Sequence, residues 1–169
     1  MLVIETKRLE ISRLELTDAG FIHQLVNDPD FIHYIGDRQV RTIDDARGYI
    51  EKGPLKSYSL NGFGLYSIKV KDSDMLIGIC GLIKRTELED IDIGYAFLSQ
   101  YRGKGYAYEA TEAVLEYGKN ELRLKRIIAI TTTDNLPSIR LLEKAGFGFE
   151  KMILMSGETA EIKLFAVNF

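Results

Sequence analysis

The sequence is poor in the residues that most often carry reactive chemistry: among 169 residues it has one cysteine, two histidines and no tryptophan. The lone thiol, Cys80, excludes an internal disulfide, and its apolar neighbours in MLIGICGLI indicate a buried, unreactive side chain rather than a nucleophile. His23 and His33 have no cysteine or acidic residue at metal-ligand spacing. The sequence therefore predicts no metal site, and no serine motif supports a Ser-His-Asp triad.

The sequence also lacks long apolar runs and a strong charge of either sign. No stretch approaches the roughly 20 apolar residues of a membrane span, and the opening MLVIETKRLEISRLEL has neither the basic leader nor the apolar core of a signal peptide. The formal net charge of −3 argues against a nucleic-acid partner, which requires clustered Lys and Arg. We therefore expect a cytoplasmic protein with no membrane partner, and a single domain over residues 1–169 because a chain of this length builds one core.

Apolar and β-branched residues predict several strands in the first half of the chain. They are expected over residues 2–14, 64–70, 75–84 and 89–98, the last three as an antiparallel meander. A short helix is expected over 19–27, ending before Pro29, because the residue ahead of a proline disfavours the helical conformation. A second helix is expected from Thr42, a capping residue, to Gly53.

The second half of the chain alternates helix and strand. Small and apolar residues recur at helical spacing in YAYEATEAVLEY and predict a helix over 106–122. RIIAITTT is typical of a buried strand, and a helix over 137–145 should follow, capped by Asp134 or Asn135. Residues 147–169 are expected to form two strands that turn at SGET. Strands first and a βαβ-like half afterwards predict a mixed α/β (α+β) sheet with helices on both faces.

The most informative stretch is DIDIGYAFLSQYRGKGYAYEA, in which Gln100-x-x-Gly103-x-Gly105 lies between a strand and a helix. Two glycines let the backbone turn tightly and approach a ligand closely. The first turn of the helix presents unpaired N–H groups and the positive end of the helix dipole, and the flanking Arg102 and Lys104 add charge. The pattern predicts an anion cradle that suits a diphosphate. A glycine-rich turn that merely starts a helix is the alternative.

The residues exclude two nucleotide-binding motifs. A Walker-type loop needs Gly-Lys followed by Ser or Thr for magnesium, whereas here Gly105 follows Gly103-Lys104. A dinucleotide fingerprint needs a third glycine, and Tyr108 stands at that position. The cradle is therefore expected to bind another kind of phosphate ligand.

A second motif, DNLPSIRLLEKAGFGFE, opens with Asn135-x-x-Ser138 and closes at Gly146-Phe147. Together, Q-x-x-G-x-G and N-x-x-S-x-x-L-x-E-K-x-G-F resemble the motifs of the GNAT acyltransferases. With IETKRLEISRLELTDA at its start, the chain looks most like the RimJ/RimL-type subgroup, which acetylates alanine or serine N-termini of ribosomal proteins and has many members with other substrates. The resemblance covers nearly the whole chain. It implies the GNAT fold, a mostly antiparallel twisted sheet of six to seven strands with helices on both faces.

The resemblance implies acetyl-CoA as cosubstrate and no metal, and it transfers family roles to the matching positions. In the family, the backbone of the first motif binds the CoA diphosphate, and the matching residues are Arg102, Gly103, Lys104, Gly105, Tyr106 and Ala107. The pantetheine arm pairs with the end of the preceding strand, whose exposed backbone groups need partners; the matching residues are Phe97, Leu98 and Ser99. The asparagine of the second motif contacts the cofactor, so Asn135 is expected to bind it and to cap the helix.

The residue expected to assist the leaving group differs from the one that is commonest in the family. Many members carry a tyrosine just before Glu-Lys that protonates the leaving thiolate, whereas this chain has Leu142. The subgroup instead has the serine of the second motif, here Ser138. Because a thiol has a pKa of about 8.5, a hydrogen bond to the departing thiolate or a relay through water is sufficient. A serine that merely occupies the first helical turn is the alternative.

The general base is expected at Asp92, where similar sequences have a glutamate, and it would take the ammonium proton through a water. A solvated strand carboxylate is the alternative for Asp92. Glu109 is the alternative base, unless its negative charge in the first turn only stabilises the helix through the helix dipole. The expected mechanism is direct attack of the amine on the thioester in a ternary complex, with a strand N–H near Leu98 facing the oxyanion.

The acceptor is expected to be a primary amine at a protein or peptide N-terminus, but no motif identifies it. The acceptor pocket should be formed by residues 21–58 and the last hairpin, where Asp28, Asp30 and Asp37 either attract a cation or are simply solvated. The alternatives are a small-molecule acetyltransferase, for a polyamine, an aminoglycoside or an amino-acid-like amine, and a non-catalytic acyl-CoA-binding sensor. A monomer and a homodimer are both compatible with the sequence.

Overall fold

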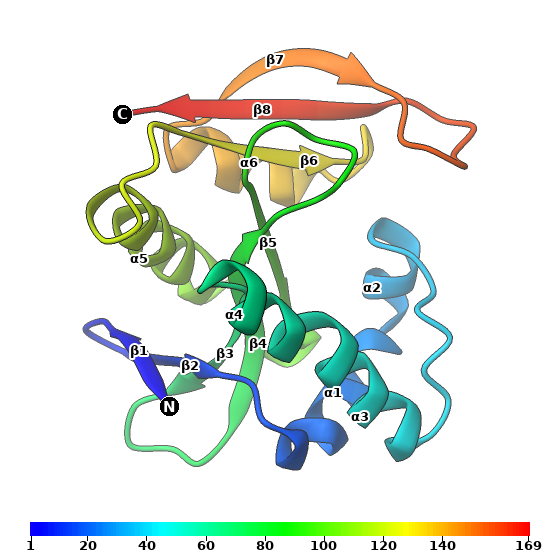
Figure 1. Cartoon of the computed structure of the whole chain (residues 1–169), viewed down its shortest axis with the longest axis vertical. Helices are drawn as coiled ribbons and strands as arrows, with labels where there is room; N and C mark the ends of the chain where they lie inside the picture. Colours follow the sequence, from blue (N-terminus) through cyan, green and yellow to red (C-terminus); the bar gives the residue numbers. More distant parts are fainter.

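The computed structural model describes all residues, 1–169, and contains one eight-stranded sheet with helices packed against it (Figure 1). The strands lie in the order β1-β2-β3-β4-β5-β6-β8-β7. Every neighbouring pair is antiparallel except β5 and β6, which are parallel. The predicted mixed α/β class with a mostly antiparallel sheet is confirmed, with eight strands in place of six to seven.

The strands are β1 (Leu2–Glu5), β2 (Leu9–Arg13), β3 (Leu65–Val70), β4 (Leu76–Ile83), β5 (Asp92–Phe97), β6 (Arg126–Thr131), β7 (Gly148–Ile153) and β8 (Ile162–Asn168). The helices are α1 (Ala19–Val26), α2 (Pro29–Tyr34), α3 (Ile43–Ile50), α4 (Lys56–Asn61), α5 (Tyr106–Asn120) and α6 (Leu136–Lys144). Three short helical turns are η1 (Leu16–Asp18), η2 (Glu51–Leu55) and η3 (Ser99–Tyr101). None of the helices combines the length and the apolar character needed to cross a lipid bilayer.

The extra strand arises at residues 2–14, for which the sequence predicts a single strand. The chain reverses there, and β1 and β2 pair antiparallel. The Thr6 N–H donates to the Leu9 carbonyl (2.9 Å), and the Leu9 N–H donates to the Thr6 hydroxyl (2.9 Å). A threonine side chain closes this turn, and the glycine, proline or asparagine that usually marks a turn is missing, so the sequence pattern does not reveal it.

The helix at Pro29 is also missing from the sequence prediction. α1 ends before Pro29 as expected, but Pro29 itself starts α2, and the Asp28 carboxylate caps it by accepting from the Asp30 N–H (3.0 Å). Proline suits the first turn of a helix because an N–H at that position has no acceptor within the helix.

The predicted end of the next helix, Gly53, is wrong. The Thr42 side chain caps α3 as expected, but the helix continues through the π-helical turn η2, which contains Pro54, into α4. Proline has no backbone N–H to donate, and a π turn lets the helix continue past it. The helix ends at Gly62, whose φ of 80° lies in the left-handed region.

The side chains of β5 alternate between two hydrophobic clusters. Ile93 and Phe97 belong to a cluster that includes residues of α5 and α6, and Tyr95 packs against it. Leu98 belongs to a second cluster with residues of α1, α2 and α3, and Ala96 packs against that one. β5 is therefore covered by α5 and α6 on one face and by α1, α2 and α3 on the other.

The parallel strands β5 and β6 pair at a single register position, Asp92 opposite Ile128, where the Ile128 N–H donates to the Ile91 carbonyl (2.9 Å). Beyond it, β5 continues alongside β4 and β6 alongside β8. Figure 1 shows β6 running across the upper end of β5. We call this divergence the β5–β6 fork. Backbone groups on its inner edges have lost their sheet partners, and such groups need others.

Candidate active site

The turn between β5 and α5 has the backbone geometry of an anion site. Gly103 and Gly105 have φ angles of 73° and 80°, in the left-handed region that glycine tolerates best. The first bond of the helix runs from the Glu109 N–H to the Gly105 carbonyl (3.1 Å), so the N–H groups of residues 106–108 have no acceptor within the helix. No side chain caps them. A Cβ added at Gly103 would meet no atom within 4 Å, so the turn has open space for a phosphate.

A guanidinium that the sequence pattern does not indicate lies beside this turn. Arg8, between β1 and β2, donates from Nη1 to the Lys104 carbonyl (2.9 Å) and from Nε to the Glu109 carboxylate (2.6 Å). It also lies over the Tyr106 ring, 4.6 Å from the centroid. The Lys104 ammonium has no carboxylate partner and lies over the Tyr101 ring at 5.5 Å. Lys104 therefore places an unpaired positive charge beside the turn, whereas Arg8, whose charge Glu109 balances, keeps Nη2 as a hydrogen-bond donor there. Only the fold brings Arg8 to this position.

Glu109 is occupied by these contacts and does not suit the role of a general base. Its carboxylate also accepts from the Thr6 hydroxyl (2.6 Å) and from the Arg8 N–H (2.9 Å). Burial alone would raise the pKa of Glu109, but the hydrogen bonds from Thr6 and Arg8 outweigh it and lower the pKa below its usual value. Glu109 is thus a weaker base than an ordinary glutamate, and it fixes Arg8 in place.

Arg102 does not supply the anion site with the positive charge that the sequence predicts. Its Nε donates to the Phe97 carbonyl (3.0 Å), and its terminal nitrogens bind Asp28 (3.0 Å) and Asp30 at the start of α2. Its backbone N–H donates to the Ser99 carbonyl (3.2 Å). Because two carboxylates already balance the guanidinium, Arg102 ties the loop to α2 and adds no free positive charge.

The backbone of β5 narrows the oxyanion donor that the sequence predicts near Leu98. The Leu98 N–H donates to the Ile77 carbonyl (2.9 Å), at the β4 edge, and is not free. Successive residues of a strand direct their backbone groups to opposite edges. The Phe97 N–H therefore points to the other edge, where Ile91 binds β6 and where no strand pairs with β5 beyond Asp92. Phe97, rather than Leu98, has the N–H that is available inside the fork.

Asp92 lies where β5 and β6 part, and its side chain is only 1% exposed. Oδ2 accepts from Arg85 Nε (2.7 Å), whereas Oδ1 has no hydrogen-bond partner. Burial raises the pKa of Asp92 to about 6, against the opposing effect of the Arg85 guanidinium. The alternative of a solvated carboxylate is therefore wrong. A buried carboxylate that titrates near neutral pH is suited to accept a proton.

Ser138 and Asn135 lie at the start of α6. The Asn135 Oδ1 accepts from the Ser138 N–H (3.3 Å), which makes Asn135, not Asp134, the helix cap and leaves its amide nitrogen unpaired. The Ser138 hydroxyl lies 2.6 Å from the Tyr95 hydroxyl. Sequence reasoning missed Tyr95, because an aromatic residue in a strand pattern is read as core. Alternation along β5 puts Tyr95 and Asp92 on opposite faces of the strand.

Cys80 stays outside the chemistry of this site. Its side chain is fully buried, and burial raises the pKa of the thiol to about 12. The thiolate is the nucleophilic form of cysteine, so Cys80 is unreactive at neutral pH, as its apolar neighbours predict.

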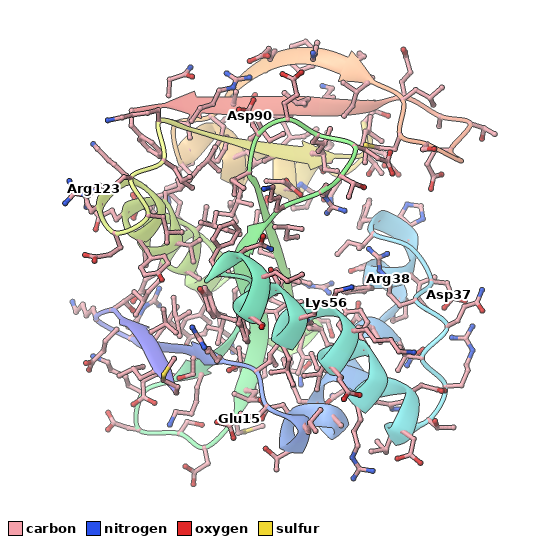
Figure 2. The ribbon with its side chains drawn as sticks, in the orientation of Figure 1. Glu15, Asp37, Arg38, Lys56, Asp90 and Arg123 are labelled. Carbon is pink, nitrogen blue, oxygen red and sulfur yellow. The ribbon has the colours of Figure 1, made fainter.

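The acidic residues expected to attract a cation are already paired. Asp28 and Asp30 bind the arginine of the anion-site loop, and Asp37 forms a two-pronged ion pair with Arg41 (2.9 and 2.5 Å). Figure 2 shows Asp37 directed outward and Arg38 directed toward the middle of the molecule. Arg38 has no carboxylate partner, so the unpaired charge of this loop is positive.

The chain matches the family model described as the acetyltransferase (GNAT) domain over residues 8–148. It is similar to the uncharacterized N-acetyltransferase YnaD of Bacillus subtilis, with 35% identity over 157 residues that cover 91% of this chain and 89% of that protein. A solved acetyltransferase of the GNAT family from Bacillus anthracis is 30% identical, with a TM-score of 0.81 over 99% of this chain and 98% of its own. RimL, a ribosomal L7/L12 α-N-protein acetyltransferase solved with coenzyme A, is 14% identical with a TM-score of 0.77, over 99% of this chain and 98% of its own, a likeness of fold alone.

The raised pKa of Asp92 predicts a pH-dependent contribution to stability. The folded-state pKa of about 6 lies above the roughly 3.9 expected in the unfolded chain, so the folded protein binds the proton more tightly. This contribution is fully present below about pH 4 and is lost as the pH rises through about 6, by on the order of 3 kcal/mol. We expect the free energy of unfolding of the wild type to fall by this amount relative to Asp92→Asn. Urea unfolding of both proteins across this range measures it, and a constant difference would contradict the raised pKa.

Proposed function

The chain belongs to the GNAT acetyltransferase family and is an acetyl-CoA-dependent N-acetyltransferase, and we propose that it acetylates the primary amine of a protein or peptide N-terminus. One observation carries the proposed mechanism. The Asp92 carboxylate and the hydroxyl pair of Tyr95 and Ser138 lie on opposite faces of β5, at the fork. An amine can therefore arrive at one face while a thiol leaves on the other, in one ternary complex.

We assign cofactor binding to the open donors around the fork. The N–H groups of residues 106–108 meet the diphosphate, Lys104 supplies the charge that Arg102 does not, and Arg8, held by Glu109, adds a guanidinium donor. The Phe97 N–H and the unpaired amide nitrogen of Asn135 hold the pantetheine arm and thioester between β5 and α6. Acetyl-CoA supplies the acetyl group in activated form, as a thioester.

Asp92 takes the proton of the incoming ammonium. Its pKa of about 6 keeps it ionised at neutral pH, yet only about two units below the pKa of an α-ammonium group, so the proton transfer is not steeply uphill. Arg85 occupies Oδ2 and leaves Oδ1 as the accepting oxygen. Because the side chain is buried, we expect a water to relay the proton.

The acetyl transfer itself needs no covalent enzyme intermediate. The neutral amine nitrogen forms a bond to the thioester carbon, the C–S bond breaks, the sulfur leaves as thiolate, and the nitrogen releases its excess proton to water as the amide forms. The Phe97 N–H stabilises the oxyanion, and the Ser138 hydroxyl donates a hydrogen bond to the developing thiolate. Cys80 is buried and protonated, so it does not compete as an acyl carrier.

The charges on the acceptor side favour a peptide over a polyamine. A polyamine carries several cations, but the three acidic residues expected to attract a cation, Asp28, Asp30 and Asp37, are ion-paired. Burial raises the pKa of the Tyr49 hydroxyl, and the guanidiniums of Arg38 and Arg85 oppose that rise, so both lie within electrostatic reach of α3. Guanidinium groups bind peptide carbonyls and carboxylates well. This chemistry agrees with the RimJ/RimL-type subgroup that the sequence motifs resemble.

Two alternatives are retained. An amino-acid-like small molecule presents an amine next to a carboxylate, where a peptide has an amide carbonyl, and Arg38 would bind that carboxylate. A non-catalytic acyl-CoA sensor would need the donors of residues 103–107 and Asn135, but it would have no need of Ser138 or Asp92.

A panel of acceptors tests the acceptor class. Peptides with free N-termini, their N-blocked copies, spermidine, an aminoglycoside and free amino acids are compared by the release of free thiol from acetyl-CoA. We expect kcat/KM for the best free-N-terminal peptides to exceed that for spermidine by at least about 10-fold, because the unpaired guanidinium of Arg38 disfavours a polycation. Preference for spermidine would contradict the peptide proposal, and absence of turnover with every amine would favour the sensor.

Ser138→Ala and Asn135→Ala should have different kinetic effects. Negative charge on sulfur exists mainly in the transition state, so Ser138→Ala should lower kcat by roughly 10- to 100-fold and leave the KM for acetyl-CoA nearly unchanged. Asn135→Ala should mainly raise that KM, because its amide binds the cofactor before and during the reaction. Steady-state kinetics of both variants decide the matter. Full turnover of Ser138→Ala with chemistry rate-limiting would leave Ser138 only a residue of the first helical turn.

A further inference from the structure

Two hydroxyl groups, one on β5 and one on α6, meet at the fork. The Tyr95 hydroxyl lies 2.6 Å from the Ser138 Oγ and 3.4 Å from the Ser138 carbonyl. The shorter distance is that of a good O–H···O hydrogen bond, and the longer one is at the limit of hydrogen bonding. Tyr95 therefore binds the side chain of Ser138 in preference to its backbone.

Either hydroxyl can donate in this contact, and the surroundings of Tyr95 bear on which one does. The phenol lies half-buried beside the α5–α6 cluster, and burial raises its pKa well above the usual value, although the hydrogen bond to Ser138 opposes the rise. The phenol therefore stays protonated at any pH at which the enzyme works. It has one hydrogen, and the Ser138 Oγ is a nearer acceptor than the Ser138 carbonyl, which favours Tyr95 as the donor and Ser138 as the acceptor.

Accepting this bond orients the hydroxyl of Ser138. A serine hydroxyl has one hydrogen and two lone pairs. With one lone pair occupied by Tyr95, the hydrogen of Ser138 must point elsewhere. The Ser138 backbone N–H is held by Asn135, so the serine side chain starts from a fixed position at the helix start. A chain of two hydrogen bonds also polarises the second donor, which strengthens it toward an anion.

We propose that Tyr95 is a positioning residue for acetyl transfer, which holds the Ser138 hydrogen directed at the departing sulfur; the inference rests on the proposed function. No proton moves along the pair: Tyr95 keeps its proton, Ser138 donates only a hydrogen bond, and the sulfur leaves as thiolate. Tyr95 thus supports the leaving group from β5, in a chain that lacks the tyrosine that many family members carry before Glu-Lys.

Tyr95→Phe removes the hydroxyl and keeps the ring. We expect kcat to fall about 10-fold, because the Ser138 hydrogen then samples other directions, with the KM for acetyl-CoA changed less than about twofold. The double variant Tyr95→Phe/Ser138→Ala should be no slower than Ser138→Ala alone, because Tyr95 acts only through Ser138. If the role of Tyr95 is purely structural, Tyr95→Phe should instead lower kcat by the same factor in the wild type and in Ser138→Ala.

Tyr117→Phe is the matched control. Tyr117 is another half-buried tyrosine, on α5, and packs edge-on against Tyr66 at 6.4 Å, with no contact to Ser138. We expect wild-type kcat for this variant. Calorimetry with coenzyme A and thermal melting report that each variant is folded and binds cofactor. Should Tyr95→Phe fail to fold, Tyr95→Met, which also lacks the hydroxyl, takes its place.

The possible outcomes separate this inference from the proposed function. Wild-type kcat in Tyr95→Phe together with slow turnover in Ser138→Ala would overturn the role of Tyr95 and leave acetyl transfer standing. An equal loss of kcat when Tyr95→Phe is added to the wild type and to Ser138→Ala would also overturn it, in favour of a structural role. A wild-type protein that binds coenzyme A but transfers acetyl to no amine would overturn the proposed function and this inference with it.

Discussion

The site depends on the single register position at which the parallel strands β5 and β6 pair. Parallel strands in a regular sheet share hydrogen bonds along their whole length, whereas here the ladder stops at Asp92 and Ile128. The divergence frees the Phe97 N–H for a ligand and puts Asp92 at the point where the strands part. Because side chains alternate along β5, a buried carboxylate and a hydroxyl pair reach its two faces within four residues. A continuous sheet would have closed the position at which amine and thioester are proposed to meet.

Ion pairs hold the loops around the fork. Glu109 holds Arg8 beside the anion site, Arg102 ties the same loop to α2 through Asp28 and Asp30, and Arg85 binds the buried Asp92. Exposed pairs of this kind contribute little to stability, typically up to about 1 kcal/mol. Their importance lies in position: each links a segment near the fork to an element distant in sequence. The Arg85–Asp92 pair differs, because a buried carboxylate without a partner would be costly.

The sequence predicts what depends on local pattern and misses what depends on distant contacts. The meander of β3, β4 and β5, the long helix α5 and the glycine turn at Gly103 and Gly105 follow from residue periodicity and from glycine itself. The turn at Thr6 and the helix at Pro29 are missed because side chains, rather than turn residues, close them. Arg8 and Tyr95 are missed because their partners, Glu109 and Ser138, lie far along the chain. The predicted charge of Arg102 is wrong because Asp28 and Asp30 pair with its guanidinium. The oxyanion donor predicted near Leu98 is narrowed to Phe97, because the Leu98 N–H donates to Ile77.

The most direct measurement of the central claim is amide hydrogen exchange, followed residue by residue with NMR as coenzyme A is added. In the free protein, the amides of Phe97 and residues 106–108 have no acceptor in the sheet or helix and should exchange rapidly. The account predicts that coenzyme A slows exchange at these amides and leaves those of the outer edge of β7 unchanged. Unchanged exchange at Phe97 and residues 106–108 under saturating coenzyme A would contradict the placement of the cofactor in the β5–β6 fork.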